Sequence, residues 1–250
     1  VNYHYFYPRH IEWYTAGENL EYIDIIKTKL MNNGAISTSI CYDGQFIDAN
    51  FNHYQPSSSS WVPNHIISII GWDDNHFVPA AGQNGAWLCK NSWGEAWGDN
   101  GYFWISYYDK WACQEPELGA VSFYDVEQLQ YSTIYYYDYH GWVDEFTEAN
   151  IACNAFYPKE DTWLKAVSIF TTTDSVDYEI KIFDKLGENG LSHILSITNG
   201  TANHKGFHTI DLELPVSIED GDPFYVYFKI SRGGLAYDRT SAVEATPSTG

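Results

Sequence analysis

The stretch from Asn91 to Tyr102 constrains the fold of this chain more than any other feature. It reads Asn-Ser-Trp-Gly-x-x-Trp-Gly-x-x-Gly-Tyr, so tryptophan and glycine, two uncommon residues, recur at fixed intervals. The residues on either side, Ala86–Lys90 and Tyr102–Tyr107, are apolar, aromatic and β-branched, which is typical of strands. The sequence therefore predicts a structured loop held between two β-strands.

A histidine precedes this loop on another predicted strand. His65 opens the apolar run His65–Trp72, which we expect to stop at Asp73–Asn75. By itself, such a histidine is more often a structural residue than a catalytic one. The loop Asp73–Gly85 is nevertheless long enough to let the strands of His65 and Asn91 lie side by side, which would bring an imidazole and an amide together.

The residues before His65 predict one helix and one strand. Asn19–Asn33 has apolar side chains at helical spacing, with Asn19 in position to cap the helix and Gly34 in position to end it. Ala35–Cys41 then reads as a strand.

Together, these segments resemble the papain-like cysteine peptidases. Leu30–Ser37 is similar to the end of a helix and the strand after it in that family, and residues 15–110 correspond to the histidine-bearing half of its two-lobed fold. The resemblance implies that His65 is the catalytic base, that Asn91 orients its ring and that Trp93 covers the bond between them. It implies an α+β fold class, with the β-rich half of a papain-like fold in this part of the chain.

The same resemblance implies two contacts with a substrate. Ser39 would line part of the S2 pocket, and Asn64, directly before His65, would contact the substrate beside the scissile bond. A purely structural role for residues 37–40 fits the sequence equally well.

The nucleophile of such an enzyme has no counterpart among these residues. The family has it on a helix about 130 residues before the histidine, whereas only 64 residues precede His65. We interpret the four cysteines, Cys41, Cys89, Cys113 and Cys153, as mostly structural and unpaired. Cys41 precedes His65 but lies on a predicted strand, with no helix N-terminus to stabilise a thiolate. We therefore expect an N-terminal chain of the same protease to supply the cysteine.

The chain beyond residue 116 has a different pattern. Short β segments separated by turns follow one another from about residue 130 onward, without a helical pattern, which favours an all-β sandwich. The predicted strands include Leu164–Thr171, Asp177–Phe183, His193–Thr198, Phe207–Leu212 and Pro223–Ile230. They resemble the lectin-like β-sandwich that follows the peptidase region in certain bacterial surface and secreted papain-like proteases. We divide the chain into residues 1–116, residues 117–240 and a tail, 241–250.

This second resemblance implies a carbohydrate or cell-wall surface as a partner and a secreted or cell-surface location, in a bacterium. The aromatic cluster Tyr135–Tyr139 is either an interdomain strand or a ligand contact. No cofactor is required by the expected chemistry. Acidic loops could hold calcium, which prefers oxygen ligands, although no ligands are assigned and no other metal is expected.

The net charge excludes one class of partner. The chain has 33 acidic and 13 basic residues, a net charge of −20, which repels phosphate backbones and argues against nucleic-acid binding. The leading hypothesis is a secreted cysteine endopeptidase acting on polypeptides. The alternative is a non-catalytic carbohydrate-binding or adhesion protein that retains half a peptidase fold. An unrelated transglutaminase- or acyltransferase-like enzyme fits His65 but not the loop after Asn91.

Overall fold

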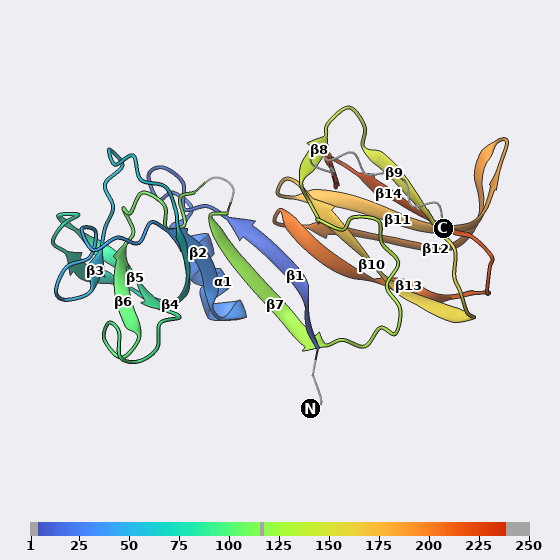
Figure 1. Cartoon of the computed structure of the whole chain (residues 1–250). Coiled ribbons are helices and arrows are strands. Elements are labelled where there is room, and N and C mark those ends of the chain that lie inside the picture. Colours follow the sequence, from blue (N-terminus) through green and yellow to red (C-terminus); the bar gives the residue numbers. More distant parts are fainter. Residues whose placement is uncertain (1–4, 116–117, 239–250) are drawn as a thin grey trace. The chain divides into compact units, whose positions relative to one another are not determined.

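The structure, a computed structural model, describes residues 5–115 and 118–238 (Figure 1). The chain forms two compact units. The first unit consists of His10–Glu127, and the second unit consists of the residues before His10 and after Glu127.

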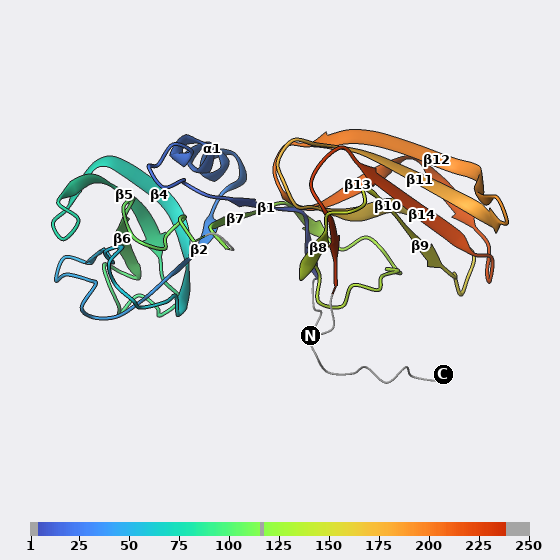
Figure 2. The same cartoon turned by 90° about the horizontal axis from the view of Figure 1, so that it is seen from above.

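The first unit is a sheet with one helix. Its elements are β1 (Phe6–Tyr14, whose first residues belong to the second unit), α1 (Ile23–Asn33), β2 (Ile36–Ile40), β3 (Asn52–His53), β4 (His65–Val78), β5 (Gln83–Lys90), β6 (Tyr102–Ser106) and β7 (Ala120–Gln128). The strands follow the order β1-β7-β2-β4-β5-β6-β3. The pairs from β7 to β6 are antiparallel, and β3 is parallel to β6. In both views α1 lies beside β2 and β4 (Figures 1 and 2).

The core of the first unit lies between α1 and this sheet. Ile26 and Leu30 are four positions apart and therefore share one face of the helix. Both are buried and cluster with Ile36 of β2, Ile69 of β4 and Trp87 of β5. Burying a large apolar side chain stabilises a fold by roughly 1.5–3 kcal/mol, so this cluster holds in place β4, which begins at His65, and β5, which Asn91 follows directly.

The helix begins later than the sequence predicts. It starts at Ile23 rather than Asn19 and has no side-chain capping bond. Leu20 has a φ of 62°, which a continuing α-helix does not allow, and its amide donates a hydrogen bond to the Gly17 carbonyl at 3.1 Å. The predicted cap at Asn19 is wrong because a tight turn occupies the place of the first helical turn. The predicted end at Asn33 is confirmed.

The strand that begins at His65 is longer than predicted. It continues through Asp73–Asn75 to Val78 and pairs with β5 in a hairpin. Register shifts after Ile69 and after Asp73 mark bulges, which let an antiparallel pair accommodate extra residues without ending. The predicted stop is wrong because these polar residues are exposed on the hairpin instead of forming a loop.

The second unit is built from β-strands. They are β8 (Asp144–Phe146), β9 (Ile151–Phe156), β10 (Thr162–Thr171), β11 (Val176–Gly187), β12 (Gly190–Ala202), β13 (Gly206–Ile218), β14 (Phe224–Ile230) and β15 (Leu235–Tyr237). One sheet has the order β12-β11-β14-β9, β10 pairs with β13, and β8 pairs with β15. Ile180 and Phe224 from the first of these sheets cluster with Ile169 and Leu212 from the β10–β13 pair, so the two layers share one core. All five predicted strands are present, and the fold class is confirmed.

The first unit extends past residue 116, where the sequence analysis divides the chain. β7 pairs with β2 through Ser122 opposite Ile36 and Ala120 opposite Thr38. The chain therefore stays within the first unit until Glu127. The predicted tail, residues 241–250, lies outside the described residues.

Candidate active site

The β4–β5 hairpin brings His65 and Asn91 together. Its register places Ser68 opposite Lys90, so His65 and Asn91 lie at the same end of the two strands. His65 Nε2 donates a hydrogen bond to Asn91 Oδ1 at 2.8 Å. Because an amide oxygen only accepts, the neutral ring has its proton on Nε2 and presents Nδ1 as an acceptor.

Asn91 is held firmly in this position. Its backbone amide donates to the Gly101 carbonyl at 2.9 Å, and its Oδ1 also accepts from the amide of Ser92 at 2.8 Å. The side chain is buried, and its Nδ2 has no hydrogen-bond partner among the described residues. A buried N–H donor without a hydrogen-bond partner costs about 1–3 kcal/mol. A hydrogen-bond acceptor placed next to Asn91 Nδ2 would therefore stabilise this site.

The glycines of the loop are required by its geometry. Gly98 and Gly101 have φ values of 66° and 90°, a region that other residues rarely adopt. A Cβ on Gly98 would lie 2.5 Å from the Tyr102 carbonyl oxygen, and a Cβ on Gly101 would lie 3.2 Å from that of Gly94. The fixed intervals in the sequence therefore reflect a loop that folds back closely on itself.

Aromatic rings cover one side of the His65 imidazole. Trp93 stacks on it with ring centroids 4.8 Å apart and an interplanar angle of 26°. Trp97 packs edge-on against Trp93 at 5.1 Å. Trp93 thus lies over the histidine that bonds Asn91. The shielding role that the sequence analysis gives to Trp93 stays a prediction.

Ser39 and Asn64 have well-defined local contacts, and their predicted contacts with a substrate stay predictions. Ser39 is buried and pairs with Ile66, and its hydroxyl has no partner within the described residues. The Asn64 side chain binds the backbone of Tyr42 twice: its Oδ1 accepts from the Tyr42 amide at 2.8 Å, and its Nδ2 donates to the Tyr42 carbonyl at 3.0 Å.

The sequence analysis did not identify Tyr42. Its ring meets Trp93 edge-on at 4.5 Å and lies 6.4 Å from the His65 ring. The available signal was strand pairing, because Ile40 lies opposite His65 and Tyr42 follows it by two residues.

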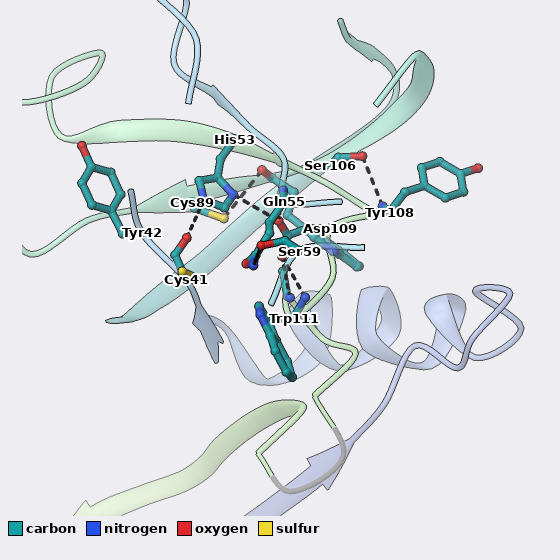
Figure 3. A network of polar contacts seen from close by, with 12 residues as sticks. Cys41, Tyr42, His53, Gln55, Ser59, Cys89, Ser106, Tyr108, Asp109 and Trp111 are labelled. Carbon is teal, nitrogen blue, oxygen red and sulfur yellow. Dashed lines mark hydrogen bonds and ion pairs between the residues drawn. The ribbon is translucent and has the colours of Figure 1, made fainter. Parts of the chain in front are cut away.

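A second histidine of the first unit is buried in a network of polar contacts (Figure 3). His53 Nε2 donates to the Cys41 carbonyl at 3.1 Å, and its Nδ1 lies 3.2 Å from Asp109 Oδ2. This second contact is within ion-pair distance, and Nδ1 makes no aligned hydrogen bond within the described residues. Burial acts to raise the pKa of Asp109, but the close contact with His53 and the hydrogen bonds from the amides of Ala112 and Trp111 hold it below its usual value.

The surroundings of the four cysteines disfavour the thiolate form. Cys41, Cys89 and Cys113 are buried in the first unit, and all four are free thiols, which confirms that they are unpaired. Burial raises the pKa of Cys41, raises that of Cys89 well above its usual value and raises that of Cys113 to about 12. Burial also raises the pKa of Cys153, in the second unit. Such thiols remain protonated and attack carbonyls poorly.

The described residues contain no group of three or more His, Cys, Asp or Glu side chains placed to hold a metal ion. Calcium binding by the second unit stays a prediction. Among the helices of the described part of the chain, none has the length and apolar character needed to cross a membrane.

Comparison with known proteins matches each of the two units to a protein family. Residues 10–120 match the family profile of the papain family cysteine proteases, and residues 134–247 match that of the lectin like domain. Among curated relatives, mouse (Mus musculus) cathepsin J is 43% identical over 54 residues, which are 22% of this chain and 16% of that protein. Cathepsin B-like cysteine proteinase 5 of Caenorhabditis elegans is 29% identical over 92 residues, 37% of this chain and 24% of that protein.

Two solved structures share the arrangement of elements. The clostridial cysteine protease Cwp84 after propeptide cleavage has a TM-score of 0.77 at 20% identity, covering 96% of this chain and 61% of that one. The cysteine protease and lectin-like domains of Cwp84, described as a surface layer associated protein of Clostridium difficile, give 0.70 at 22%, covering 90% of this chain and 49% of that one.

At 20% and 22% identity, the likeness to the two solved structures concerns the fold. The chain spans 16% and 24% of the length of the two curated relatives, and 61% and 49% of the two solved chains. The chain thus joins a papain-family peptidase region to a lectin-like domain.

Proposed function

We propose that this chain is the histidine- and asparagine-bearing part of a cysteine endopeptidase. The observation that supports this most directly is the 2.8 Å bond from His65 Nε2 to Asn91 Oδ1, covered by the stacked ring of Trp93. The bond leaves Nδ1 with its lone pair available, which is the protonation state that a general base requires.

The proposed chemistry needs a thiol next to His65 Nδ1. The imidazole takes the thiol proton, and the resulting thiolate attacks the carbonyl carbon of a peptide bond. The imidazolium then gives this proton to the leaving amine as the carbon–nitrogen bond breaks. A water molecule, deprotonated by His65, hydrolyses the thioester and releases the acid. Asn91 keeps the ring in one orientation throughout.

We propose that a further segment of the same protease supplies this thiol, because all four cysteines of the present chain have raised pKa values. An open sheet face supports this proposal. Ile67 and Ile69 of β4 are buried under α1, but Ile66 and Ile70 point the other way and are 59% and 40% exposed. Exposed aliphatic side chains on one face of a strand suit a surface that a partner covers.

We propose, second, that the lectin-like domain binds a carbohydrate or cell-wall ligand. A cavity of about 1140 Å³ in the second unit supports this proposal. Exposed rings of Tyr136, Tyr137 and Trp163 line it together with the polar side chains of Asn154 and Asp238, a combination of flat apolar faces and hydrogen-bonding groups suited to sugars. Binding of cell-wall polysaccharide that is lost in Trp163→Ala would support the proposal, and unchanged binding would contradict it.

A secreted or cell-surface location fits both proposals. The large acidic excess suits a protein that stays soluble outside the cell. One structural neighbour is described as surface layer associated.

Labelling of the catalytic thiolate tests the main proposal. The natural protein, with every segment that copurifies, is treated with an epoxide or iodoacetamide at pH 6, and the labelled cysteine is located by mass spectrometry. We expect the label on a cysteine outside these 250 residues, and we expect it to disappear in His65→Ala. Labelling of Cys41 would contradict the proposal, because the reactive thiolate would then belong to this chain. No labelling of any chain would also contradict it and would favour a non-catalytic binding protein.

A further inference from the structure

Tyr42 occupies a constrained position beside the candidate base. Its ring touches Trp93 at 4.5 Å with an interplanar angle of 87°, and Trp93 in turn stacks on His65. The two rings therefore form an aromatic corner at the edge of the imidazole. At 4.5 Å between centroids, perpendicular rings are in contact, so no group fits between them.

The backbone of Tyr42 is held by side chains from two directions. The Asn64 amide accepts from the Tyr42 N–H and donates to its carbonyl. On the preceding residue, the Cys41 carbonyl accepts from buried His53, which Asp109 anchors in turn. Figure 3 shows the Tyr42 ring extending away from this buried network. These hydrogen bonds hold the backbone that carries the Tyr42 ring in place.

The corner lies where the leaving group must be. In the proposed reaction, His65 gives its proton to the departing amine, so the residue bearing that amine has to lie against the imidazole. Trp93 stacks on that ring, and Tyr42 flanks it. A side chain on the departing residue is therefore within reach of Tyr42, whose ring centroid lies 6.4 Å from that of His65.

We propose that Tyr42 is a specificity-determining residue that selects substrates with a small residue immediately after the scissile bond. This inference rests on the proposed peptidase activity. Glycine, alanine or serine fits beside the corner, whereas a branched or aromatic side chain collides with the tyrosine ring.

The test compares two peptides that differ only in the residue after the scissile bond, glycine in one and leucine in the other. The natural protein with its cysteine-bearing segment is used, and kcat/KM is measured for each peptide. We expect the wild type to prefer glycine by at least about tenfold, because one mismatched aliphatic group in a packed site changes rates by about 10- to 200-fold. Tyr42→Ala should reduce this preference to about twofold, and Tyr42→Phe should retain it.

Tyr108→Ala is the matched control. Tyr108 is also a tyrosine of the first unit, is 40% exposed, and has no ring contact with His65 among the described residues. Its removal should leave the glycine-to-leucine ratio unchanged. Thermal unfolding of each variant identifies any that fails to fold, in which case Tyr42→Leu takes its place with the same expected loss of preference.

The outcomes separate the two proposals. A wild type that neither cleaves peptides nor takes up the thiolate label overturns the peptidase itself. A wild type that cleaves, but whose ratio is the same in Tyr42→Ala, overturns the role of Tyr42 alone. A wild-type preference for leucine that Tyr42→Ala abolishes would also overturn it, because the corner would then be a binding platform instead of a limit.

Discussion

Two histidines of the first unit, His65 and His53, each donate a hydrogen bond from Nε2 to an amide oxygen, but they differ in what faces Nδ1. His65 bonds Asn91 and has no partner at Nδ1 within the described residues. His53 bonds the Cys41 carbonyl and has a buried carboxylate, Asp109, 3.2 Å from Nδ1. A free ring nitrogen at the surface can exchange a proton with a substrate. A buried ring with an oxygen facing each nitrogen has no position left for a substrate and serves to hold the structure together.

The largest expected effect is the loss of activity on removing His65. His65→Ala should lower kcat/KM by about 10³-fold or more, since general acid–base catalysis contributes roughly 10²–10⁴-fold and activation of the thiol is lost as well. Asn91→Ala should lower it less, by about tenfold to a hundredfold, because the base remains but is no longer oriented.

His76 provides the control for this experiment. It lies on the same strand, donates from Nε2 to Asn52 Oδ1 at 2.6 Å and stacks on Trp104 at 4.2 Å, and so reproduces the local geometry of His65. His76→Ala should leave kcat/KM within about twofold. An equal loss in both variants would show that the assignment of His65 as the base is incorrect.

Removing the buried pair should affect stability instead of chemistry. Asp109→Ala leaves His53 buried without its carboxylate and removes acceptors from the amides of Gln55, Trp111 and Ala112. Breaking a buried pair in this way costs about 3–5 kcal/mol, which urea unfolding would measure. His193→Ala breaks the exposed pair with Asp184 and should change the free energy of unfolding by less than about 1 kcal/mol. Similar losses in the two variants would contradict this difference.

The contribution of Asp109 should also depend on pH. Its folded-state pKa is lowered from the ordinary 3.8, so its stabilising contribution is fully present above that value and is lost as the pH falls through the lower folded pKa. The difference in unfolding free energy between wild type and Asp109→Asn should be constant from about pH 5 to 7 and should shrink below about pH 4. A difference that grows on acidification would contradict the lowered pKa.

The smallest effect on folding is expected at the open face of β4. Ile66→Glu combined with Ile70→Glu should change the free energy of unfolding of this chain by less than about 1 kcal/mol, because both side chains are largely exposed. The same variant should bind the cysteine-bearing segment at least about tenfold more weakly, measured by titration calorimetry or copurification. Met31→Glu, on the exposed side of α1, should bind normally. Equal binding of the cysteine-bearing segment by the wild type, the double variant and Met31→Glu would contradict the proposed covering of this face.

Much of the candidate site could be predicted from local sequence. The loop from Asn91 to Tyr102 requires glycine at positions of positive φ and close backbone approach, and such requirements leave fixed intervals in the sequence. The strand that begins at His65 and its pairing with that of Asn91 were predicted for a similar reason, since continuous apolar runs indicate buried strands. The helix start and the end of β4 were wrong because a turn at Leu20 and bulges in the hairpin override local preference.

Tertiary structure alone decided the surroundings of each functional side chain. Tyr42 reaches the His65–Trp93 stack because β2 lies beside β4 and Asn64 binds its backbone. Likewise, His53 meets Asp109 only once β3 lies beside β6, whose end leads to that carboxylate. The sequence determined that this chain has a papain-like loop and a histidine to match it, because those features depend on neighbouring residues. Which histidine has a free nitrogen, and which ring limits the substrate, depends on contacts between residues far apart in the chain.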